Sequence, residues 1–243
     1  MRRPTLASRG LPASSAPHET RATSVLRPIV FGANDGLVSN LALVMGVAGA
    51  NPAPGVIVLA GVAGLLAGAF SMAVGEYISV QSQRELLAFQ LAFQKQQLRE
   101  APEQERAILV QSYVDRGIPA ADAGRFADVL FAQPDQAVEL LIFEEVGLDA
   151  RSIGSPQAAA GGSFLAFTLG AFIPLLPYLL SAGAPAFAAS LLVSLAALGV
   201  LGTGIALLTR RHLWYGAARQ LLLGGVAAGV TFAVGSLIGV SAA

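Results

Sequence analysis

Polar side chains that could bind a cation interrupt two apolar stretches of this sequence. Asp35 and Ser39 stand four residues apart in the first stretch, and Met72 and Glu76 stand four residues apart in the second. Side chains with this spacing project from one face of a helix. Oxygen donors favour Mg, Ca or Mn, whereas a thioether shifts the preference toward softer transition metals such as Fe(II). The candidate metal site comprises Asp35, Met72 and Glu76, with Asn34, Ser39 and Asn40 as supporting groups.

Each of these residues also has a purely structural interpretation. Asp35 could cap a neighbouring helix end, and Glu76 could be a solvated anchor near the membrane surface. Met72 could fill the core, as Met45 is expected to do. Acidic groups inside a membrane are costly, however, and they usually mark a pathway. The group as a whole therefore favours a divalent-cation site, whose carboxylates could carry protons when the metal is absent.

The composition indicates a membrane protein. The 243 residues are 54% hydrophobic and only 12% charged, whereas a soluble domain has about 25% charged residues. The net charge is zero, which predicts no nucleic-acid partner. Cysteine is absent and neither His18 nor His212 lies in an apolar stretch, which excludes thiolate and imidazole metal sites there.

Enzymatic activity is not expected, because the sequence has no HExxH, GxSxG, Walker-type or complete dinucleotide-binding motif. No permanently bound cofactor is expected either. A divalent ion would be a transported substrate.

Five apolar segments are long enough to cross a membrane as helices, since about 20 residues span roughly 30 Å. On the first segment, Asp35 lies roughly 10 Å from the end at which the segment begins. On the antiparallel second segment, Met72 and Glu76 lie about 12 Å and 6 Å from the same side of the membrane. The three side chains are therefore predicted to share one level. The segments cover residues 29–50, 55–80, 157–181, 184–209 and 221–240.

The predicted fold class is an all-α integral membrane protein, with five transmembrane helices and a cytosolic helical domain inserted between helices 2 and 3. Residues 81–156 hold 12 of the 15 acidic residues and 7 of the 15 basic ones. The second membrane helix is expected to continue into this domain. Three short helices should follow, beginning near Pro102, Pro119 and Pro134. The predicted parts are a disordered tail (1–26), helices 1–2 (27–80), the helical domain (81–156) and helices 3–5 (157–243).

The basic residues predict the orientation. With five spans, all 15 Lys and Arg lie on one side, including Arg210, Arg211 and Arg219 in the last connection. The positive-inside rule then puts the N-terminus and the helical domain in the cytosol and the C-terminus outside. Short loops and the lack of a sorting signal favour a bacterial inner (plasma) membrane over a vacuole.

Two motifs resemble the vacuolar iron transporter family: NDGLV at residues 34–38 and SM-x-x-GEY-x-S-V-x-SQ at residues 71–83. The resemblance extends to GSP at 154–156 and LGAFIPLLPYLL at 169–180. It implies a homodimer that moves Fe(II) and Mn(II) out of the cytosol in exchange for protons. The path would lie between the subunits, lined by spans one and two. The family's aspartate, methionine and GEY glutamate correspond to Asp35, Met72 and Glu76.

The resemblance also implies a cytosolic domain that binds metal through glutamates and a methionine pair. This sequence has Gln94, Gln97 and Ile108 where glutamates recur, and Leu141 and Ile142 in place of the methionines. The domain is therefore expected to bind fewer ions, or to act mainly as a dimerising cap. The glutamates that could still bind metal, or could simply be solvated helix faces, are Glu100, Glu103, Glu105, Glu139, Glu144 and Glu145.

The expected partners are divalent metal ions, protons, the lipid bilayer and a second copy of the chain. The alternative function is that of a non-transporting metal-sensing or scaffold membrane protein with the same fold.

Overall fold

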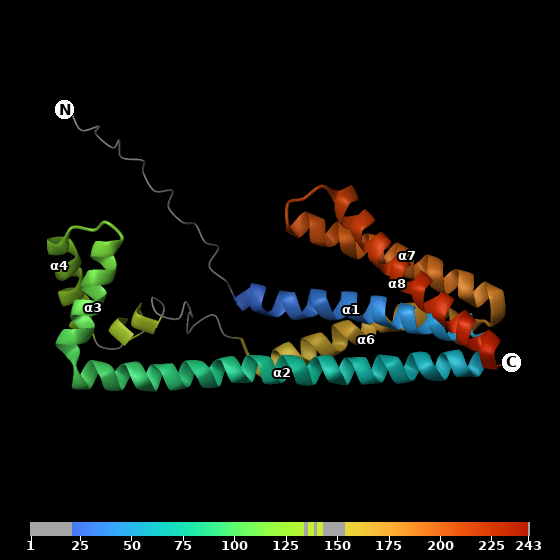
Figure 1. Cartoon of the computed structure of the whole chain (residues 1–243), viewed down its shortest axis with the longest axis horizontal. Helices are drawn as coiled ribbons and strands as arrows, with labels where there is room; N and C mark the ends of the chain where they lie inside the picture. The colour runs from blue at the N-terminus through green and yellow to red at the C-terminus, as the bar shows by residue number, and fades with distance from the viewer. Residues whose placement is uncertain (1–20, 134–135, 139, 143–153, 243) are drawn as a thin grey trace, which may run out of the picture.

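One helix runs from the membrane bundle to a separate helical unit and is the longest element of the fold (Figure 1). The computed structural model describes residues 21–133, 136–138, 140–142 and 154–242. In it, α2 covers Pro54–Glu100, which is 47 residues or about 70 Å of helix. This length exceeds what a bilayer needs. The prediction that the second span continues outward as one helix is confirmed.

Helix α1 covers Arg21–Gly49 and is joined to α2 by a short connection. Asn51 in this connection has a φ of 51°, in the left-handed region that asparagine tolerates better than most residues. The chain thereby reverses, and α2 returns antiparallel to α1 (Figure 1). α1 begins at Arg21, within the predicted tail of residues 1–26. Residues 1–20 of that tail lie outside the described residues.

The outer end of α2 carries α3 (Pro102–Asp115) and α4 (Ala120–Phe131). Gly117 stands between them with a φ of 93°, a conformation that glycine adopts at no steric cost. These bounds confirm the helices predicted from Pro102 and Pro119. Of the predicted third short helix, residues 136–138 and 140–142 are helical, and the remainder lies outside the described ranges.

Three further helices complete the bundle. α6 covers Pro156–Leu180, α7 covers Gly183–Leu208 and α8 covers Leu213–Ala242. Ser155 caps α6, because its hydroxyl accepts a hydrogen bond from the backbone N–H of Ala158. At the sharp α6–α7 connection, Gly183 has a φ of 69°.

The start of the fifth span differs from the prediction. α8 begins at Leu213, whereas the apolar segment was expected to begin at residue 221. Arg219 therefore lies inside the helix and not in the connection. Hydropathy identifies the apolar part of a helix, but helix bounds follow the backbone hydrogen bonds, which Arg219 and Gln220 do not interrupt.

Within the described part of the chain, five helices are long and apolar enough to cross a membrane. This agrees with the five predicted spans and with an all-α integral membrane protein. The spanning segments are Pro28–Gly49, Pro54–Glu100, Pro156–Leu180, Gly183–Leu208 and Leu213–Gly239.

Helix α1 is the centre of the bundle and packs against α2, α6, α7 and α8. Its approach to α6 is very close, since a Cβ added at Gly36 would lie 2.2 Å from the carbonyl oxygen of Phe167. Gly235 on α8 meets the backbone of Gly46 in the same way. Small residues allow such contacts between membrane helices. The side chains at the centre of this packing are Leu37, Leu41, Val44 and Met45.

Candidate functional site

A hollow of about 260 Å³ lies where α1, α2 and α6 meet, at the level predicted for the metal site. Asp35 and Ser39 contribute from α1, and Met72 contributes from α2. The antiparallel course of α1 and α2 brings these residues together although they are far apart in sequence. The full lining is Asp35, Ser39, Asn40, Leu43, Gly64, Gly68, Ser71, Met72 and Phe167.

Asn40 supplies a buried oxygen to this hollow. Only 2% of the residue is exposed, and its Nδ2 donates a 2.6 Å hydrogen bond to the carbonyl oxygen of Ala171 on α6. That bond fixes the orientation of the amide. Its Oδ1 is buried and accepts no hydrogen bond from the described residues. A Cβ added at Gly64 would lie 3.1 Å from this Oδ1, so the oxygen faces α2.

Asp35 and Ser39 form the opposite, more accessible part of the lining. The carboxylate of Asp35 is half-buried. The Ser39 hydroxyl donates a 2.6 Å hydrogen bond to the backbone carbonyl oxygen of Asp35. The hydroxyl proton of Ser39 is therefore used in this backbone hydrogen bond, and the lone pairs of its oxygen remain available as acceptors. The polar atoms that face a ligand are thus oxygens.

Met72 takes part in both the hollow and the core. It is partly buried and packs against a cluster that contains Leu65, Ala69 and Phe167. Gly68 makes room for this cluster, since a Cβ added there would meet the Phe167 ring at 2.1 Å. The thioether is consequently held in position beside the polar groups. This geometry agrees with Met72 as a core residue, and it agrees equally with Met72 as a metal ligand.

Two of the sequence-predicted residues do not line the hollow. Glu76 is half-buried one turn farther along α2 from Met72. Asn34 lies on the side of α1 that faces α8, where its Oδ1 accepts a 2.6 Å hydrogen bond from Nε2 of Gln220.

Sequence reasoning missed Ser71 and Gln220. Ser71 lines the hollow directly, and its position beside Met72 was a signal that could have been used. Gln220 was overlooked because the fifth span was expected to begin after it. An amide within a membrane helix needs a partner, which was the available signal.

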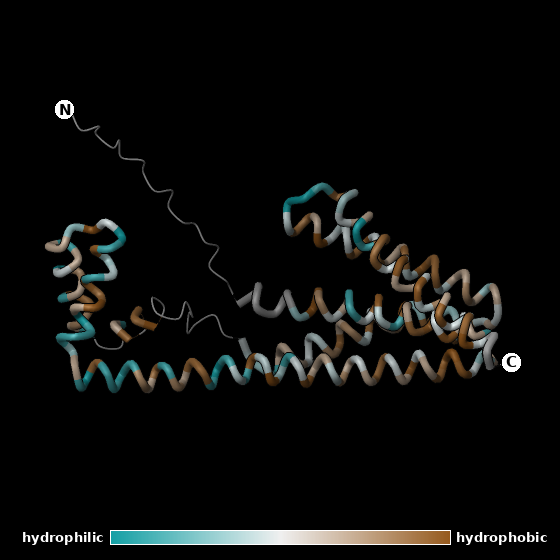
Figure 2. The backbone as a smooth tube through the Cα atoms, viewed as in Figure 1, coloured by the Kyte–Doolittle hydropathy of each residue, from teal (hydrophilic) through white to brown (hydrophobic). Residues whose placement is uncertain are grey.

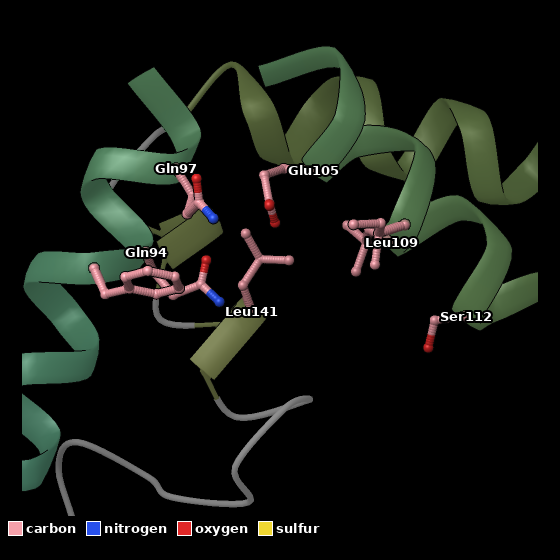
Figure 3. A pocket seen from close by; sticks show the side chains of 8 residues that line it. Gln94, Gln97, Glu105, Leu109, Ser112 and Leu141 are labelled. Carbon is pink, nitrogen blue, oxygen red and sulfur yellow. The ribbon is translucent and has the colours of Figure 1, made fainter. Parts of the chain in front are cut away.

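A second hollow, of about 290 Å³, lies in the helical unit at the outer end of α2 (Figure 3). Gln94 and Gln97 from α2 and Glu105 from α3 contribute their polar groups around Leu141. Four positions at which the sequence departs from the resembled family thus gather in one place: Gln94, Gln97, Ile108 and Leu141. Ile142 is buried elsewhere, beside Leu87 and Val138.

The other predicted glutamates do not add to this lining. Glu103 is exposed, and so is Glu100, which accepts a 2.7 Å hydrogen bond from Gln96. Glu139, Glu144 and Glu145 lie outside the described residues. Among the residues that the structure describes, no group of three or more His, Cys, Asp or Glu side chains could hold a metal ion. The described lining of the outer hollow therefore offers one carboxylate with two amides, a weak set for a divalent ion.

Comparisons with known proteins match nearly the whole chain. Residues 26–236 match the model of the VIT family. The chain is 36% identical over 216 residues to a vacuolar iron transporter of Acanthamoeba castellanii, covering 87% of this chain and 78% of that protein. It is 28% identical over 221 residues to vacuolar iron transporter 1 of Arabidopsis thaliana, covering 89% and 87%. The corresponding protein of Eucalyptus grandis is 27% identical over 221 residues, covering 89% and 88%.

Proposed function

This chain belongs to the VIT family, and on that premise we propose that it transports divalent transition-metal ions, with Fe2+ and Mn2+ as substrates. The observation that carries the proposal is the hollow between α1, α2 and α6. Asp35 with its carboxylate, Asn40 with its amide oxygen and Met72 with its thioether line this one hollow in a membrane bundle. Carboxylate and amide oxygens suit Mn2+, and the sulfur adds affinity for a softer ion such as Fe2+.

Glu76 extends this site toward the helical unit. It lies one turn beyond Met72 on α2, in the direction of the outward extension. An ion that approaches from that side meets Glu76 first and Asp35 next. In this proposal both carboxylates are neutralised by the ion when it is bound and by protons when it has left, because bare carboxylates in a membrane are costly. The direction is out of the cytosol, by proton antiport.

The pathway is proposed to lie at a homodimer interface. In the apolar stretch of α2 that would cross the membrane, only 22% of the residues are buried within one chain. Yet α2 contributes Met72 and Glu76 to the proposed metal site. Exposed apolar side chains such as Leu59, Leu66 and Phe70 lie along this helix. A second copy packed against α2 would close the open side of the hollow.

The proposed orientation follows from the basic residues. The N-terminus and the helical unit lie in the cytosol, the C-terminus lies outside, and the membrane is a bacterial inner membrane. With one carboxylate in its described lining, the outer hollow is proposed to bind few ions or to serve as a dimerising cap.

The test is flux through the purified full chain in liposomes. We expect Fe2+ and Mn2+ to move away from the side of the helical unit and into the liposome. Uptake should be faster when the liposome interior is the more acidic side, because protons then flow out as metal flows in. Protein-free liposomes are the control. Counterflow of protons should be recorded by an internal pH dye. Metal binding without flux, with or without the gradient, would contradict transport and favour the metal-sensing or scaffold alternative.

A further inference from the structure

The turn between α7 and α8 concentrates positive charge beside aromatic side chains. We call one set of exposed residues the basic turn. It comprises Arg210, Arg211 and His212 in the connection, Trp214 and Tyr215 at the start of α8, and Arg219 farther along α8. Figure 2 shows the turn as a hydrophilic patch at the end of two hydrophobic helices. Three arginines within ten residues make it the main cationic feature of the last three spans.

Within the ranges that the structure describes, these arginines have no acidic partner. From residue 150 to the C-terminus the sequence contains no Asp or Glu. Among the described residues, the side chains of Arg210, Arg211 and Arg219 form no ion pair, and the salt bridges present belong to the helical unit. The α7 C-terminus contributes only about half a negative charge. Most of the charge of the basic turn is therefore left for an external anion.

The backbone of the turn is ordered by its own hydrogen bonds. The N–H groups of Arg210 and Arg211 donate to the carbonyl oxygens of Leu207 and Ala206, at 3.3 Å and 2.9 Å. Arg210 has a φ of 53°, which reverses the chain. The N–H of Tyr215 donates to the carbonyl oxygen of His212 at 3.1 Å. The guanidinium groups thus project from a fixed turn and are not needed to hold it together.

The surroundings of the turn identify the level at which it lies. Leu207 and Leu208 at the end of α7 and Leu213 at the start of α8 are exposed apolar residues beside it. Trp214 is 71% exposed and Tyr215 is 52% exposed. Their rings are arranged edge to face, with the ring centroids 6.2 Å apart. Exposed Trp and Tyr at the end of a spanning helix lie at the headgroup level of a bilayer.

We propose that the basic turn binds the headgroup of an anionic phospholipid. Guanidinium groups match phosphate oxygens in a bidentate arrangement. The adjacent leucines contact the acyl chains, and the two aromatic rings lie at the boundary between chain and headgroup. A soluble anion would leave that apolar rim without a role, so the observations favour a lipid. This inference needs a membrane-embedded chain and is independent of metal transport.

Trp214 provides a direct reporter, because it is the only tryptophan in the chain. The full chain would be reconstituted in phosphatidylcholine vesicles that contain a low, equal fraction of a brominated lipid, either phosphatidylglycerol or phosphatidylcholine. Bromine quenches indole fluorescence at short range. We expect stronger quenching by brominated phosphatidylglycerol, corresponding to at least about a five-fold local enrichment. The preference should shrink as salt is raised.

The matched variants change equal amounts of charge. Replacing Arg210 and Arg211 by Gln should abolish the preference for phosphatidylglycerol. Replacing Arg84 and Arg99, exposed on α2, by Gln should leave it intact. Equal quenching by both lipids in the wild-type chain would overturn the proposal, as would an unchanged preference in the Arg210/Arg211 variant. If a second copy of the chain covered the turn, Trp214 would be shielded from both lipids, which would also overturn it.

Discussion

The side-chain amide of Gln220 on α8 donates a 2.6 Å hydrogen bond to Oδ1 of Asn34 on α1, the residue directly before Asp35. Gln220 is only 6% exposed. Neighbouring residues on a helix point about 100° apart. The hydrogen bond holds Asn34 toward α8 and so fixes the rotation of α1 about its axis. In that rotation Asp35 faces the hollow beside α2.

Gln220→Leu should weaken both the fold and the site. It leaves Oδ1 of Asn34 without its donor, which costs about 1–3 kcal/mol, so the thermal midpoint should fall and metal flux should decline. Replacing both residues by leucine removes the unpaired group, and the double variant should be more stable than the sum of the single losses implies. Thermal unfolding in detergent measures this coupling, and strictly additive losses would contradict it.

Asp35→Asn should abolish metal transport while the fold is kept. A unit charge pair at about 4 Å contributes roughly 4 kcal/mol near a protein surface, so Fe2+ flux should fall about a hundredfold or more. Asp115→Asn is the matched control, since Asp115 lies on α3 with its carboxylate beside Gln111. Flux at wild-type level in the Asp35 variant, measured in liposomes, would mean that this carboxylate is structural.

Met72→Leu should change the selectivity between metals more than it changes stability. The two side chains have similar volume, so the cost to folding should stay below about 1.5 kcal/mol. Loss of the thioether should lower Fe2+ flux relative to Mn2+ flux. Met45→Leu is the control, because Met45 is buried in the core away from the hollow. The ratio of Fe2+ flux to Mn2+ flux would be measured with both ions present. An identical ratio in the two variants would mean that Met72 only fills the core.

Gly36→Ala should destabilise the bundle. The new methyl group would lie 2.2 Å from the carbonyl oxygen of Phe167, and overpacking of this kind costs about 1–3 kcal/mol. Gly225→Ala is the control, because a Cβ there meets nothing within 4 Å. In the control the higher helix propensity of alanine favours stability. Equal thermal midpoints for the two variants would contradict the close α1–α6 contact.

Glu105→Gln should have a milder effect than any change at Asp35. Glu105 is the acidic residue in the described lining of the outer hollow, and it is partly exposed. A partly exposed charge contributes at most about 1 kcal/mol, so flux should fall no more than about fivefold. The same liposome assay measures it. Complete loss of transport would show that the helical unit is essential for metal handling.

The elements of this fold could be predicted from the sequence because their signals are local. An apolar segment of sufficient length must satisfy its own backbone hydrogen bonds in a membrane, which requires a helix. That reasoning yields the five spans. The helices that begin at Pro102 and near Pro119 follow from another local signal, the preference for proline at the start of a helix. The shared level of Asp35 and Met72 follows from the rise per residue, and both line one hollow.

Rotation about the helix axes was decided by the tertiary structure alone. The sequence places Asn34, Asp35 and Asn40 within two turns of one helix, but it does not determine which neighbouring helix each side chain faces. Contacts between residues far apart in the chain determine this: Gly36 against Phe167, Asn40 against Ala171 and Asn34 against Gln220. Glu76 shares its face of α2 with Met72 but lies one turn beyond the residues that line the hollow. Length and depth are local properties of a helix, whereas its facing direction depends on close packing against its neighbours.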